Sequence, residues 1–78
     1  MSNKYTVKAA KYEVMSEVVE YLERKISEAE SDLEREKNRL AEATEDSYKP
    51  YYVERIDEYA DMVAAYKTVQ SLFIESFD

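Results

Sequence analysis

The chain has 78 residues with one proline and no glycine, cysteine or histidine, and 18 acidic residues against 11 basic ones give a net charge of −7. Without glycine it has no phosphate-cradling loop or dinucleotide fingerprint, and without cysteine it has neither disulfides nor thiolate metal ligands. Without histidine it lacks the usual general base and the commonest metal ligand, so we expect no enzyme, no cofactor and no metal.

The hydropathy and charge of the sequence also predict where the protein is located and which kinds of partner it lacks. No stretch has the length and apolarity of a membrane span or the apolar core of a signal peptide, so we expect no membrane partner and a cytoplasmic location. An acidic chain is repelled by phosphate backbones, so we expect no direct nucleic-acid binding.

The first half of the chain predicts one long helix over residues 6–44, with Asn3 or Thr6 as its N-cap. Large apolar residues recur every seven positions, as the a positions of a heptad repeat do, and the d positions are apolar until Glu36. We explain the charged residue at this d position by fraying: Glu36 lies near the loop, where the hairpin opens to water. The a positions are Tyr5, Tyr12, Val19, Ile26, Leu33 and Leu40, and the first d positions are Met15, Leu22 and Ala29.

Residues 45–50 form the predicted loop, and a second helix is predicted over 51–77. Ser47 can cap this helix, and Lys49 is biased away from helical angles because it precedes Pro50. A short connection makes the two helices antiparallel, so the predicted fold is an all-α two-helix hairpin that forms a single domain over residues 1–78. The apolar stripe of the second helix consists of Tyr52, Ile56, Tyr59, Val63, Tyr66, Gln70, Phe73 and Phe77.

The two predicted helices differ in length, with the first helix the longer. Measured from the loop, Phe77 should lie level with residues 15–19, which leaves residues 1–14 as an N-terminal arm without a partner helix. A homodimer that forms a four-helix bundle would cover this arm, and we favour it over an arm that folds back as a short third helix. The residues assigned to self-association are Tyr5, Tyr12, Val19, Ile26, Val63 and Phe73.

Four acidic residues of the second helix form a separate pattern. Glu54, Asp57, Glu58 and Asp61 are spaced by three and four, so they share one helix face. The face can be a solvated surface, a mimic of a row of phosphates, or a cation site. Neither an EF-hand loop nor a glutamate–histidine pair supports the cation site.

Two tyrosines, Tyr48 and Tyr51, flank Pro50 at the loop, and tyrosine is enriched at interface hot spots. We predict that these rings and the four acids bind a protein partner with a basic surface, although the rings could simply cover the end of the hairpin. The predicted function is a small acidic protein-binding module, in its sharper form a phage-type inhibitor that blocks a basic nucleic-acid-binding surface of a host protein. The alternative is a structural subunit that acts through self-association.

Overall fold

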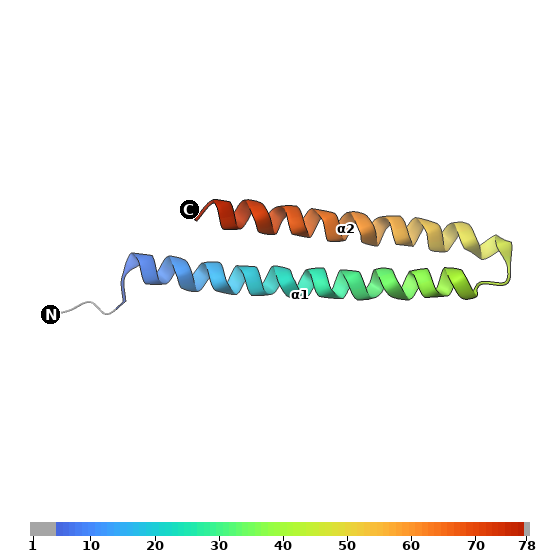
Figure 1. Cartoon of the computed structure of the whole chain (residues 1–78), viewed down its shortest axis with the longest axis horizontal. Helices are drawn as coiled ribbons and strands as arrows, with labels where there is room; N and C mark the ends of the chain where they lie inside the picture. Colours follow the sequence, from blue (N-terminus) through green and yellow to red (C-terminus); the bar gives the residue numbers. More distant parts are fainter. Residues whose placement is uncertain (1–4, 78) are drawn as a thin grey trace.

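The computed structural model describes residues 5–77, which form two long antiparallel helices joined by a short connection (Figure 1). Helix α1 spans Val7–Glu42, a short 3₁₀ helix η1 spans Asp46–Tyr48, and α2 spans Lys49–Glu75. The molecule measures 71 × 17 × 11 Å. The predicted all-α hairpin is confirmed, and no strand occurs within residues 5–77.

Helix α1 begins with a side-chain cap. Thr6 has extended backbone angles, and its Oγ1 accepts a hydrogen bond from the Ala9 N–H at 3.1 Å. This bond satisfies one of the N–H groups that have no partner inside the helix. The other predicted cap, Asn3, lies outside the described residues.

Replacing Thr6 with alanine is expected to lower the free energy of unfolding by about 1 kcal/mol, because the Ala9 N–H loses its acceptor. Amide hydrogen exchange should accelerate in the first turn of α1, and thermal unfolding followed by circular dichroism should report the stability loss. Thr44→Ala, at an exposed position between the helices, is the matched control. Equal losses in the two variants would contradict a capping role for Thr6.

The connection between the helices differs from the prediction. Ala43 and Glu45 have extended backbone angles, so α1 ends at Glu42 rather than at 44. Ser47 lies inside η1 and caps neither helix. Lys49 is helical despite preceding proline, and its Nζ forms a 2.9 Å ion pair with Asp46. The bias against helical angles before proline is therefore overridden here, and α2 begins two residues earlier than predicted.

The core of the hairpin is thin. The buried apolar side chains are Leu22, Ile26 and Ala29, which are successive d, a and d positions of α1. Every residue of the predicted α2 stripe is half-buried, and none of the described residues of α2 is fully buried. The heptad seam therefore faces α2 along the middle of α1, and two helices cannot enclose it.

The N-terminal arm continues α1. Residues 7–14 are helical, and the first turns of α1 extend past the end of α2, so the alternative in which the arm folds back is wrong for these residues (Figure 1). Phe77 also lies nearer the N-terminus than predicted, because the Lys11 Nζ is 5.7 Å from the centre of its ring. The reason is geometric: α1 ends earlier and α2 begins earlier than predicted, so α2 reaches farther along α1.

Candidate functional site

The four acids of α2 form an exposed stripe near the loop end of the hairpin. Glu54, Asp57, Glu58 and Asp61 are all exposed. Within residues 5–77, none of them lies within ion-pair distance of a lysine or arginine. We call these four residues the acidic stripe.

Several other carboxylates of the hairpin are neutralised by contrast. Asp32 pairs with Arg35 at 2.9 Å and Glu28 with Lys25 at 3.7 Å, both within one turn of α1. Glu30 pairs across the helices with Lys67 at 3.6 Å. The hairpin thus places cations beside these acids and leaves the acidic stripe without one.

The two predicted loop tyrosines are accessible. Tyr48 and Tyr51 are both exposed, and the Tyr51 ring meets the half-buried Tyr52 ring edge-on at 5.6 Å. Tyr48 and Tyr52 both line a hollow at the connection, together with Ala43 and Glu45, whereas Tyr51 does not. The exposed rings lie one to two turns from the start of the acidic stripe.

Arg55 is held between two tyrosines on α2. Its guanidinium lies 5.6 Å from the ring centre of Tyr51 and 5.4 Å from that of Tyr59, and its Nη2 donates a 2.7 Å hydrogen bond to the Tyr59 hydroxyl. The Tyr51 and Tyr59 phenols raise the pKa of Arg55 further above its ordinary value. Arg55 is therefore a fixed positive charge with little rotational freedom.

Glu36 is completely buried, with 0% of its surface exposed. The prediction that it is exposed by fraying is wrong, because α1 stays helical beyond it and α2 covers this level. Its Oε1 accepts a 3.2 Å hydrogen bond from Arg39 Nη1 and lies 3.6 Å from Arg55 Nε and 4.0 Å from Arg35 Nε. The other oxygen, Oε2, is buried without a hydrogen-bond partner in the described part of the chain.

Glu36 and the three arginines around it, Arg35, Arg39 and Arg55, form what we call the Glu36 cluster. The sequence carried one signal for it, a polar d position with Arg35 and Arg39 within one turn. The third arginine, Arg55, comes from the other helix. A buried ion pair adds little net stability, but it restricts which arrangements of the two helices satisfy its charges.

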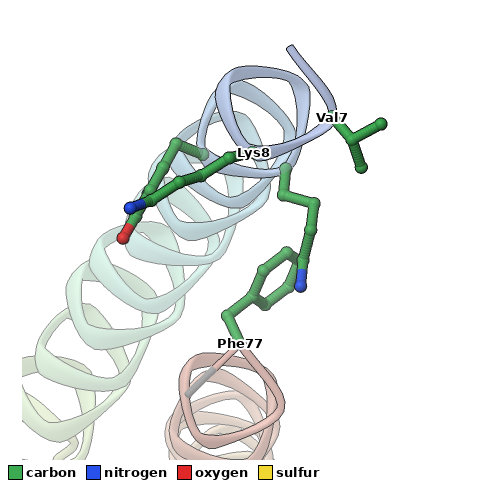
Figure 2. A pocket seen from close by; sticks show the side chains of 5 residues that line it. Val7, Lys8 and Phe77 are labelled. Atoms are coloured by element: carbon green, nitrogen blue, oxygen red, sulfur yellow. The ribbon is translucent and has the colours of Figure 1, made fainter.

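A hollow lies at the opposite, open end of the hairpin, where α1 extends past α2. It has a volume of about 350 Å³ and is lined by Val7, Lys8, Lys11, Tyr12 and Phe77. In Figure 2, Phe77 rises from the end of α2 toward the first turns of α1, and Val7 points away to one side. The Lys8 Nζ lies 6.0 Å from the Tyr12 ring centre. The open end is thus basic and partly aromatic.

Just before α1, Tyr5 is exposed, and its hydroxyl donates a hydrogen bond to the Glu13 carboxylate. This bond, together with the charges of Glu13 and Glu17, raises the pKa of the Tyr5 phenol above its ordinary value. The contact joins Tyr5 to the second turn of α1, at the exposed residue Glu13.

The six residues assigned to self-association separate into two groups. Val19, Ile26, Val63 and Phe73 are buried or half-buried on the faces where α1 and α2 meet within one chain. Tyr5 and Tyr12 are exposed. Further exposed apolar residues of the two helices include Val7, Val14, Tyr21, Val53, Met62, Val69, Leu72 and Ile74.

Residues 5–77 contain no group of three or more histidine, cysteine or acidic side chains positioned to hold a metal ion. None of the described helices is long and apolar enough to cross a membrane. Comparisons of the chain with protein-family models, curated proteins and solved structures found no match.

Proposed function

We propose that the chain is a non-enzymatic protein-binding module whose acidic stripe docks on a basic surface of another protein. The observation that supports this proposal most is that all four carboxylates of the stripe are exposed and lack an ion-pair partner among residues 5–77, whereas Glu28, Glu30 and Asp32 each have one. Like charges spaced by three and four destabilise a helix by a few tenths of a kcal/mol per pair. Such a stripe is a cost to the fold that binding to a basic partner would offset.

The spacing of the stripe supports the sharper form, mimicry of a nucleic-acid backbone. From Glu54 to Asp61 the helix rises about 10 Å, or about 3.5 Å for each successive carboxylate. A strand of duplex DNA presents one phosphate for about every 3.4 Å of helix axis. A rigid helix therefore offers a basic nucleic-acid-binding groove a similar linear density of negative charge, with Tyr48 and Tyr51 beside it as aromatic contacts.

A charge reversal tests this function. The variant Asp57→Lys, Glu58→Lys, Asp61→Lys is expected to lose binding to a partner captured from a nuclease-treated host-type lysate, while its helicity stays unchanged. A partner captured by the unaltered chain should elute as the salt concentration rises. Added duplex DNA or RNA should also release it, because the nucleic acid and the acidic stripe would compete for the same basic surface.

The matched control changes the net charge equally but away from the stripe. Glu42→Lys, Glu45→Lys, Glu75→Lys reverses three exposed carboxylates without an ion-pair partner in the described part of the chain. It should keep most of the binding. Equal losses in the two variants would mean that overall charge, rather than the stripe, attracts the partner.

A second function, self-association as a structural subunit, is favoured by a different observation. Large apolar side chains remain exposed on both helices, and the described residues bury only three apolar side chains. We propose that copies of the chain pair into a four-helix bundle, which would give this thin core the additional apolar contacts it lacks.

A further inference from the structure

Each helix carries a second apolar stripe beside the one that faces its partner. On α1 this stripe is Val7, Val14, Val18 and Tyr21, and on α2 it is Met62, Ala65, Val69 and Leu72. The spacings of seven, four and three are those by which a helix presents one face to another helix. All of these residues are exposed except Val18, which is half-buried.

Ion pairs place the two stripes on the same side of the hairpin. A residue seven positions away returns to nearly the same face of a helix, so Arg35, fourteen residues after Tyr21, continues the α1 stripe, and Arg55, seven residues before Met62, continues the α2 stripe. Both arginines lie within ion-pair distance of the Glu36 carboxylate, so the two stripes lie on the same side. The Glu30–Lys67 ion pair crosses the hairpin on its other side. We call the eight residues of the two stripes the open-half face.

The apolar character of this face stops partway along the hairpin. Toward the loop, the positions of α1 that continue its stripe are Lys25, Glu28, Asp32 and Arg35. On the other side of the hairpin, the groove between the helices is lined by polar residues that include Glu23, Glu30, Lys67 and Gln70. One side of one half of the molecule is therefore apolar and without a partner within the chain.

We propose that the open-half face binds the same face of a second copy, and this inference rests on the self-association proposed above. The two hairpins lie antiparallel, so that the halves farther from the loops overlap and the loops point apart. Charge selects this orientation. Residues 1–12 carry three lysines and no acid, and residues 13–34 carry eight acids against two bases. In the antiparallel dimer, the basic first turns of each copy lie over the acidic segment of the other, whereas a parallel dimer would set Lys8 and Lys11 against their own copies.

The hairpin as a whole exposes more surface than a compact chain of its mass. The chain exposes 6206 Å². A compact monomer of 9.2 kDa is expected to expose about 4,900 Å². The difference, about 1,300 Å², exceeds the roughly 800 Å² that each partner contributes to a standard protein–protein interface. Val7 belongs both to this face and to the lining of the hollow between the first turns of α1 and Phe77 (Figure 2).

A pair of matched substitutions tests the face. Val69→Glu places a charge in it, and Val53→Glu places the same charge on the other flank of α2, where Val53 is 45% exposed against 50% for Val69. By sedimentation, Val69→Glu should raise the dimer dissociation constant about tenfold or more, because the charge loses its water without gaining a partner, and Val53→Glu should leave it unchanged. Val14→Glu should reproduce the Val69 effect from α1, and circular dichroism should show all three variants helical.

The outcomes separate the two levels of the proposal. A chain that sediments as a monomer at every concentration would overturn self-association itself. A dimer that survives Val69→Glu and Val14→Glu would overturn only the open-half face.

Fluorescence transfer between labelled copies tests the orientation, since the chain has no cysteine of its own. Labels on Thr44→Cys should lie farther apart than the 71 Å length of one hairpin and transfer little, whereas labels on Ser16→Cys should lie close and transfer strongly. Strong transfer from Thr44→Cys, or weak transfer from both, would overturn the antiparallel overlap. Added salt should weaken the dimer, because it screens the attraction between the basic first turns of one copy and the acidic segment of the other.

Discussion

Replacing Ile26 with aspartate is expected to unfold the hairpin at 25 °C. Ile26 lies in the centre of the three-residue apolar core. The change removes about 2 kcal/mol of apolar burial and adds the cost of a buried charge with no partner, which together exceed the 3–5 kcal/mol that a core of this size supplies. Far-UV circular dichroism should show the loss of most helical signal, and urea unfolding should lose its cooperative transition.

Ser27→Asp is the control, because it adds the same side chain at the next position, where the residue is exposed. It should keep the helical signal and shift the urea midpoint only slightly. If Ile26→Asp melted at the same temperature as Ser27→Asp, the assignment of Ile26 to the contact between α1 and α2 would be wrong.

Replacing Glu36 with leucine is expected to raise the free energy of unfolding by about 1 kcal/mol or more, although it removes an ion-pair cluster. Glu36 occupies a d position in the seam, and its Oε2 is buried without a hydrogen-bond partner among the described residues. Exchanging a buried ionic group for an apolar one of similar volume removes the desolvation cost of the charge. Arg35 and Arg39 are exposed, so water can solvate them once the carboxylate is gone.

Arg55→Leu is expected to do the opposite and lower the free energy of unfolding by about 1–3 kcal/mol, because it takes a cation from beside a buried carboxylate. Arg39 still donates its 3.2 Å hydrogen bond to Glu36, so the loss stays below that of a wholly unpaired buried charge. In the Glu36→Leu background, Arg55→Leu should cost less.

Urea unfolding of the unaltered chain, the two single variants and the double variant completes this cycle and gives the coupling between the two residues directly. Lys37→Leu, an exposed neighbour of Glu36, is the control and should change stability little. A Glu36→Leu variant that is as unstable as Arg55→Leu would show that the cluster is a net source of stability.

The opposite effects of Glu36→Leu and Arg55→Leu on the free energy of unfolding would also explain what the Glu36 cluster does for the fold. A leucine at position 36 would stabilise any close approach of two apolar helices, whereas the glutamate is satisfied only where arginines surround it. We therefore expect the cluster to restrict the alignment of α2 on α1 at a cost in stability, as polar residues do at the a positions of coiled coils.

The sequence was sufficient for the two helices and for the faces by which they meet. Helix periodicity depends only on neighbouring residues, so the contact faces follow from the seven-residue spacing through Val19, Ile26 and Leu33 and from the four–three spacing of α2. For the same reason the acidic stripe could be found from spacing alone, since its four carboxylates lie on one helix.

The spacing of residues could not predict which residues of α2 lie beside which residues of α1. A shift of two residues at each helix end moved Phe77 to Lys11, and the local bias of Lys49 against helical angles was overridden. Such shifts depend on how the loop closes and how both helices pack, which no short stretch of sequence determines.

The burial of Glu36 depended on the tertiary structure most of all. The sequence places a charged residue at a d position near the loop. It could not distinguish an exposed carboxylate from a buried one, because Arg55, one of the three arginines around Glu36, lies on the other helix. The open-half face has the same origin, since its stripes come from separate helices. Local spacing therefore determined the helices and their apolar faces, whereas burial and charge pairing followed only from the closeness of residues distant in sequence.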